Sequence, residues 1–431
     1  MMKDIEKDIA GLALESALRN GADASRIVMS NGISNTFEVC DGKLEKIIGA
    51  ADRSLGIEIF CHGHYGRFST NMLDEHKLDG FIKECISTLE FVEKDRFRRL
   101  PKEKYYFKGQ SRDFGINDSS FELTSPDSKK QSAFAIFDEM NNKEGLISAS
   151  SSFSDLYYSE YILDSQGFSG LSEYTSSTVS AECTLKDGDR RPQSYWYASS
   201  PFFKDLEWKG CGEKAYRRTK AKMGSRTIAS GKYRVKIDTL VAQNMIKPLA
   251  EALSGVFLAQ NNSFLLDRLG SKVFSSKLSI LDRAVMQGRT SSRLWDSEGL
   301  EVRDCLMIDK GVVAKEYLST YEAAQMGKEP TVDEPTILSI KPFGNANLAD
   351  GILITGFNGG NCNTATGDFS YGIEGFLIEN NEVITAVSGM NFSGNLVTLF
   401  NNICAAGNDA LEFRSWDIPS LVFEDCNING N

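Results

Sequence analysis

A glycine-rich segment spans residues 356 to 394 and offers backbone and small polar groups rather than catalytic side chains. It reads GFNGGNCNTATGDFSYGIEGFLIENNEVITAVSGMNFSG, with one cysteine and no histidine. Glycine reaches backbone angles that other residues resist, and it lets a second chain approach closely. The segment therefore fits two roles, a sheet edge that holds a peptide or a set of tight turns, and the sequence leaves both open.

In the first role, an extended peptide would add a strand to the sheet edge through main-chain hydrogen bonds. Few side chains would stand in its way. The residues expected to contact such a peptide are Gly359, Gly360, Asn361, Asn363, Gly367, Asp368, Phe369, Ser370 and Gly372. Asp368 has a second expected role, in which its carboxylate bonds to nearby groups and pins the glycine-rich loop.

Cys362 lies within the same segment and is a candidate nucleophile. A catalytic thiol needs an adjacent base, yet the histidines all lie in the first fifth of the chain. We therefore interpret Cys362 as a small residue that fills a tight loop. A carboxylate pair could also act as acid and base, and the candidates are Asp296, Glu298, Asp368 and Glu374. Their separation cannot be read from the sequence, so no catalytic residue is predicted.

Only one cluster contains side chains of the types that bind metals, and it reads Cys61-His62-Gly63-His64. In a strand, alternation would send Cys61 to the opposite face from its neighbours, and Gly63 stands where a turn is needed. The pattern indicates an exposed hairpin tip. His76 follows a helix start and is expected to be solvated. We therefore expect no metal site in this chain.

Several motifs, taken in order, resemble the TldD/PmbA family, whose members carry the label "modulator of DNA gyrase". The resemblance runs from about residue 20 to the C-terminus, and the ordered set is more specific than any one motif. Besides the glycine-rich segment, the motifs are Ala22-Asp23, Asp41-Gly42-Lys43-Leu44-Glu45, Asp52-Arg53-Ser54-Leu55-Gly56, Tyr65-Gly66-Arg67-Phe68-Ser69-Thr70-Asn71 and Asp296-Ser297-Glu298-Gly299.

Catalytic members of that family carry HExxxH on a helix, where two histidines hold zinc and the glutamate activates water. The resemblance places Lys247 at the first histidine, Pro248 at the glutamate and Ala252 at the second histidine. A protonated lysine is a poor zinc ligand, and proline and alanine offer neither ligand nor base. The ending NDALEFRSWDIPSLVFEDCNINGN also lacks the cysteine of a Met-Cys-Gly-Lys type segment. The chain therefore resembles the PmbA, or TldE, branch, the non-catalytic partner.

This resemblance implies a subunit of a TldD/TldE-type zinc metallopeptidase complex, active in peptide maturation and in degradation of small unfolded proteins. A TldD-like partner would supply the zinc and the base in a heterodimer or higher assembly. This chain would bind no cofactor, shape the chamber and hold peptide, and it could form a homodimer when the partner is absent. Two alternatives stay open: an independent hydrolase or peptidase with an unrecognised site, and a stand-alone interaction protein acting indirectly on a gyrase-inhibitor or toxin-antitoxin system.

Charge and cysteine usage predict the compartment. The 431 residues include 59 Asp and Glu against 48 Lys and Arg, a net charge of −11. A chain this acidic repels a phosphate backbone, so we expect no direct contact with nucleic acid. Nine scattered cysteines without a CxxC pair indicate reduced thiols. The N-terminal MMKDIEKDIAGLALESALRNG contains no uninterrupted apolar run. We therefore expect a cytoplasmic protein without membrane contact.

Periodicity and turn residues predict an α+β protein of two domains. Residues 1–225 form an N-terminal domain of helices and mostly antiparallel sheet, and residues 226–431 form a β-rich domain with one long helix and the glycine-rich segment. Turns are predicted at Asn31-Gly32, Asp41-Gly42 and Gly63. Helices are predicted at about 5–17, 74–92, 129–141, 213–223, 239–257 and 396–405, and strands at 26–29, 35–40, 55–60, within 145–196, at 233–237 and at 420–423.

Overall fold

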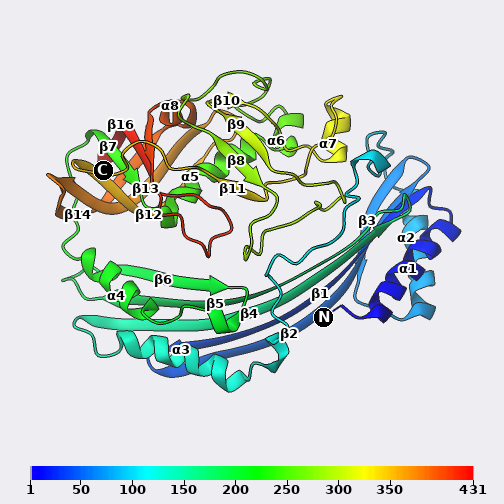
Figure 1. Ribbon diagram of the computed structural model, residues 1–431, viewed down its shortest axis with the longest axis horizontal. Helices are drawn as coiled ribbons and strands as arrows, with labels where there is room; N and C mark the ends of the chain where they lie inside the picture. The colour runs from blue at the N-terminus through cyan, green and yellow to red at the C-terminus, as the bar shows by residue number, and fades with distance from the viewer. Residues whose placement is uncertain (1, 431) are drawn as a thin grey trace.

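The computed structural model describes residues 2–430 and confirms the mixed α+β class. Its N-terminal part is one six-stranded antiparallel sheet whose long strands curve beneath the C-terminal part (Figure 1). In sheet order, the strands are β3 (His64–Thr70), β2 (Lys43–Cys61), β1 (Ala24–Cys40), β4 (Leu146–Asp164), β5 (Ser169–Leu185) and β6 (Gln193–Ser200).

Side chains alternate between the two faces of this sheet, as the pleat requires. One face is apolar and is covered at one end by α1 (Asp4–Arg19) and α2 (Glu75–Leu89), and at the other by α3 (Pro126–Met140) and α4 (Cys211–Ala221) (Figure 1). The opposite face is rich in hydroxyl residues, among them the exposed Ser54 and the half-exposed Ser30, Ser152, Ser154, Thr178 and Ser180. The helices therefore cover only the face whose apolar side chains have to be buried.

The predicted turn at Asn31-Gly32 is wrong, because both residues lie inside β1. The strands predicted at 26–29 and 35–40 are one strand of 17 residues, paired along its length with β2 and β4. Asn31 is buried and donates from Nδ2 to Glu6 Oε2 at 2.9 Å, so its amide bonds to a distant helix and not to the nearby backbone of a turn. Tertiary pairing thus overrides the local turn signal.

The turns predicted at Asp41-Gly42 and at Gly63 are confirmed, and His62 and Gly63 together form the second. All four residues have positive φ, of 46°, 80°, 51° and 86° in chain order, as two-residue hairpin loops of the primed type require. Each joins two adjacent long strands, β1 to β2 and β2 to β3.

The C-terminal part contains a second six-stranded sheet and a four-stranded one (Figure 1). The six strands, in sheet order, are β14 (Glu382–Asn395), β13 (Asp368–Glu379), β12 (Gly351–Cys362), β7 (Gly231–Ile237), β16 (Leu421–Gly430) and β15 (Ile403–Ala406). β14 also pairs with β16, which gives the sheet a barrel-like closure. The smaller sheet runs β10 (Val312–Val313), β9 (Cys305–Asp309), β8 (Ile280–Arg283) and β11 (Ile337–Ser339).

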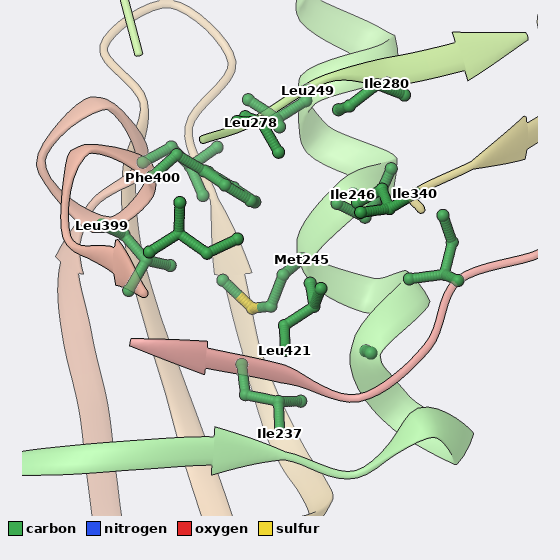
Figure 2. Packing of buried hydrophobic residues seen from close by; sticks show 14 of the residues in the cluster. Ile237, Met245, Ile246, Leu249, Leu278, Ile280, Ile340, Leu399, Phe400 and Leu421 are labelled. Carbon is green, nitrogen blue, oxygen red and sulfur yellow. The ribbon is translucent and has the colours of Figure 1, made fainter. Parts of the chain in front are cut away.

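Helix α5 (Thr239–Ala252) packs at the centre of this part. Asp238 caps it, because its carboxylate accepts from Leu240 N at 2.8 Å. Figure 2 shows Met245, Ile246 and Leu249 of α5 among side chains from the strands and α8 (Leu396–Asn401), including Ile237, Leu421 and Phe400. This packing holds the helix against the sheet that carries the glycine-rich segment.

Two predicted helices extend too far. The helix predicted over 239–257 breaks after Ala252, and a short α6 (Gly255–Ala259) follows, because Ser254 is extended and pairs with Tyr317. The helix predicted over 396–405 ends at Asn401, and the next residues form β15 against β16. In both places pairing with a distant segment outweighs helical periodicity.

The remaining elements are α7 (Thr320–Gln325) and three short 3₁₀ turns at 103–105, 121–123 and 203–205. The division predicted near residue 225 falls between α4 and β7 and stays a prediction. Among residues 2–430, none of the helices has the length and apolar character needed to cross a membrane.

Candidate functional site

An open strand edge lies beside α5 at the start of the glycine-rich segment. β7 pairs with β12 only from Ile352 to Ile354, and Asp238 N then donates to Ile354 O at 2.9 Å as the chain turns into α5. From residue 355 to 362, β12 is paired on its other side with β13, and within residues 2–430 no strand pairs with the side that faces α5. Residues 358–361 are exposed. This edge is open to an added strand.

Two glycines of β12 and one of β13, in the glycine-rich segment, differ in why glycine is needed there. Gly359 and Gly360 lie in a bulge of β12 and have φ of +72° and +95°. A Cβ on Gly360 would approach Ser370 O to 2.0 Å, and one on Gly372 would approach Asn358 O to 2.4 Å, whereas one on Gly359 would meet open space. Close backbone packing therefore requires glycine at positions 360 and 372, whereas at position 359 only the positive φ favours glycine.

The loop between β12 and β13 is held by its own hydrogen bonds. Asn363 N donates to Asp368 O at 2.8 Å, and Gly367 N, at φ +78°, donates to Asn363 O at 2.7 Å. Asp368 accepts from Asn395 Nδ2 at 2.9 Å, and this hydrogen bond lowers the pKa of its carboxyl. Asp368 thus pins the loop, as expected from the sequence.

The remaining predicted contact residues are not equally available to a ligand. Asn361, Asn363 and Ser370 are exposed, while the Phe369 side chain is 5% exposed and belongs to the core. The Phe369 backbone is also paired on both sides, with Cys362 of β12 and with Gly394 of β14, so Phe369 does not lie on the open edge.

The three positions matched to the zinc motif lie on α5 and differ in environment. Lys247 is exposed, Pro248 lies inside the helix and is buried, and Ala252 is fully buried at 0% exposure. A protonated amine, a ring without an N–H and a buried methyl group do not fit a zinc ion.

Sequence reasoning missed Glu251 and Tyr371, which interact electrostatically with Cys362. Burial, together with the charges of Glu251 and Asp368, raises the pKa of the Cys362 thiol to about 11. Burial likewise raises the pKa of Tyr371 to about 12. Cys362 is therefore protonated at neutral pH, and a thiol in that state is a weak nucleophile. The interpretation of Cys362 as a structural residue agrees with this environment.

The Cys61 to His64 segment forms the tip of the β2–β3 hairpin. The Cys61 thiol is buried against Gly21 O at 3.3 Å, and His64 Nδ1 lies 2.7 Å from Val92 O. His76 is exposed in the first turn of α2, and its backbone N–H donates to Asp74. Within residues 2–430, no three His, Cys, Asp or Glu side chains are grouped so that they could hold a metal ion.

Asp296 and Glu298 lie where the two parts of the chain meet. Arg26 of β1 donates to Glu298 O at 3.1 Å, and Glu298 Oε2 accepts from Thr320 N at 2.7 Å. Asp296 is 2% exposed and accepts from the N–H groups of Glu298, Leu300 and Asp333 at 2.9, 2.9 and 3.1 Å. Both carboxylates therefore organise a loop, while Asp368 and Glu374 lie elsewhere, on β13.

Burial, together with the charges of Asp333 and Glu298, raises the pKa of Asp296 to about 7. The folded state then binds the proton more tightly than the unfolded chain, whose aspartate titrates near 3.9. The stabilising effect of protonation is complete below about pH 4 and is lost as the pH rises to about 7. We expect wild type to lose more stability between pH 5 and pH 8 than Asp296→Asn, measured by urea unfolding. Equal losses would contradict this.

Models of protein families match most of the chain. Residues 230–430 match the PmbA/TldA metallopeptidase C-terminal domain, and residues 121–223 match the corresponding central domain. The Metalloprotease PmbA homolog of Haemophilus influenzae is 25% identical over 99% of this chain and 96% of its own length. Metalloprotease PmbA of Escherichia coli O157:H7 is also 25% identical, over 99% of this chain and 97% of its own.

Solved structures resemble the whole chain. A protein from Bacteroides thetaiotaomicron, described as a modulator of DNA gyrase, superposes with a TM-score of 0.97 at 38% identity, covering 100% of both chains. TldE from Thermococcus kodakarensis superposes with a TM-score of 0.86 at 16% identity, covering 98% of this chain and 100% of that one. At this lower identity, the second likeness shows the shared fold alone.

Proposed function

Because this chain belongs to the PmbA/TldD family of metallopeptidase-like proteins, we propose that it is the non-catalytic, TldE-like subunit of a peptidase complex and holds the peptide substrate. One observation carries the proposal: the open edge of β12 runs beside a helix whose residues 247, 248 and 252 supply neither zinc ligand nor base. A peptide added to this edge gains main-chain hydrogen bonds that do not depend on its sequence, which suits the maturation of peptides and the degradation of unfolded proteins.

In this proposal the two subunits divide the chemistry. A TldD-like partner with HExxxH holds zinc, which supplies an activated water when bound. The residues of this chain orient the peptide backbone along β12, and Gly359 has no side chain that would block the peptide. The nine cysteines are free thiols, which supports assembly in the reducing cytoplasm.

We expect the chain purified alone to contain no stoichiometric zinc and to leave unfolded peptides intact, because Lys247, Pro248 and Ala252 replace two ligands and a base. Co-expressed with a family member that carries HExxxH, it should co-purify with that chain, and the complex should contain zinc and cleave peptides. Elemental analysis, affinity co-purification and a peptide cleavage assay measure these outcomes.

The matched control is a complex in which the HExxxH glutamate of the partner is replaced by glutamine. That complex should assemble but not cleave, which separates assembly from catalysis. Zinc at one per chain in the lone protein, with activity lost to a chelator, would favour an independent peptidase. Failure to pair with any HExxxH chain would favour a stand-alone interaction protein.

A further inference from the structure

A cavity of about 520 Å³ lies between the N-terminal and C-terminal parts of the chain. β6 and α4 line one side, and β12, β14 and the first turns of α5 line the other. From β12 come residues 355 to 358, where the open edge begins. A peptide added along that edge would therefore reach this cavity with one of its ends.

Cations outnumber carboxylates in the lining. Arg190, Arg191, Arg218 and Lys222 line the cavity together with Glu182 and Glu374. Lys222 is already committed, because its amine donates to the Glu374 carboxylate and, at 2.8 Å, to Gln193 O. Arg190 is 3.5 Å from an oxygen of Asp187. Two guanidinium groups remain, those of Arg191 and Arg218.

These two arginines have hydrogen-bond donors to spare. Within residues 2–430, the Arg191 guanidinium donates only from Nη1, to the backbone oxygens of Gly188 and Arg190 at 2.9 and 2.7 Å. The nearest carboxylate oxygen recorded for Arg218, on Asp238, is 3.9 Å from Nη1, which is beyond hydrogen-bond length.

Two buried polar atoms of the same cavity have no partner among the described residues. They are Arg218 Nε and Thr355 Oγ1. A buried polar group without a hydrogen bond is costly, and such groups in a native protein call for an explanation. An unpaired donor and an unpaired hydroxyl in one cationic cavity are explained together if an anion accepts from both.

We propose that this cavity binds a carboxylate group of the peptide substrate, held by Arg218, Arg191 and the Thr355 hydroxyl. The inference rests on the peptide-holding function proposed above and adds the orientation of the bound peptide relative to β12. A strand antiparallel to β12 runs from Cys362 toward Thr355 and brings its C-terminal end to the cavity. A parallel strand would instead bring an ammonium group against the arginines. Glu182 and Glu374 in the lining favour a singly charged carboxylate over a doubly charged phosphate.

The test measures fluorescence polarisation of N-terminally labelled peptides on the purified full-length chain. The first pair of peptides shares one sequence, and one ends in a free C-terminal carboxylate and the other in a C-terminal amide. The second pair is amidated at the C-terminus, and one carries Glu and the other Gln near that terminus. We expect the free acid to bind about tenfold more tightly than the amide, as for a charge-assisted hydrogen bond. Arg218→Gln should abolish the difference.

The matched control is Arg217→Gln, which changes the neighbouring residue of α4. Its side chain is 75% exposed, against 23% for Arg218, and it does not line the cavity. This variant should keep the tenfold preference. If Arg218→Gln melts early, the exposed Arg191→Gln replaces it and should weaken the preference.

If only the glutamate peptide gains affinity over its glutamine pair, the carboxylate comes from a side chain and the cavity still binds it. Equal affinity for all four peptides, no measurable binding of any, or a preference that survives both arginine variants overturns the proposal. If the chain pairs with its zinc-bearing partner but binds all four peptides equally, only the carboxylate subsite is contradicted. If the chain never pairs, the proposed function is contradicted, whatever the peptide affinities.

Discussion

Arg26→Met is expected to lower the free energy of unfolding by about 3–5 kcal/mol, the range for removing one member of a buried charge cluster. The Arg26 side chain is 4% exposed and lies 3.5 Å from Glu58 Oε2 and 4.0 Å from Asp164 Oδ2. Its Nη2 also donates to Glu298 O at 3.1 Å, so it joins the N-terminal sheet to the C-terminal part. The methionine leaves the Asp164 carboxylate buried without its cation.

The control for this variant is Arg67→Met. Arg67 approaches the same Glu58 carboxylate at 3.9 Å, but its side chain is 69% exposed, and exposed pairs contribute only about 0–1 kcal/mol. Urea unfolding of both variants measures the difference. Hydrogen exchange should also rise around residues 296–300 in Arg26→Met alone. A loss below about 1 kcal/mol in Arg26→Met would show that the charge cluster does not hold the two parts together.

Local signals in the sequence were sufficient for some elements. The opening helix is recognisable from its apolar spacing, and the hairpin turns Asp41-Gly42 and His62-Gly63 from residues that tolerate positive φ. Asn31-Gly32 carries a similar signal, but long-range pairing on both sides of β1 keeps it extended. A local turn signal cannot reveal whether two distant strands will pair across it.

No local pattern in the sequence predicts the open edge or the cavity. The edge is open because β7 ends at Ile237, where it meets Ile354, and this register depends on two segments far apart in the sequence. The cavity likewise combines Arg191, Arg218 and Thr355 from a hairpin, a helix and a strand. Residue types at the glycine-rich segment predicted a backbone-lined surface, but only tertiary structure separates Gly359, which faces open space, from Gly360, which does not.

Because Gly359 and Gly360 have different surroundings, substitutions at the two positions should differ in their effect on stability. Gly360→Ala should destabilise the protein by about 2–5 kcal/mol, because backbone strain at φ +95° and a clash with Ser370 O act together. Gly359→Asn should cost less than about 1 kcal/mol, since asparagine tolerates φ near +72° and open space surrounds the position.

If the edge of β12 holds peptide, Gly359→Asn should bind peptide more weakly while melting like the parent, because its side chain projects from the exposed bulge that a peptide would follow. Thermal melting and fluorescence polarisation on the same preparations separate the two effects. Normal melting with unchanged peptide binding in Gly359→Asn would remove Gly359 from the peptide path. Since the glycines at 360 and 372 are already required by backbone packing, the segment would then be a structural loop, and the peptide would have to be held by another surface of the complex.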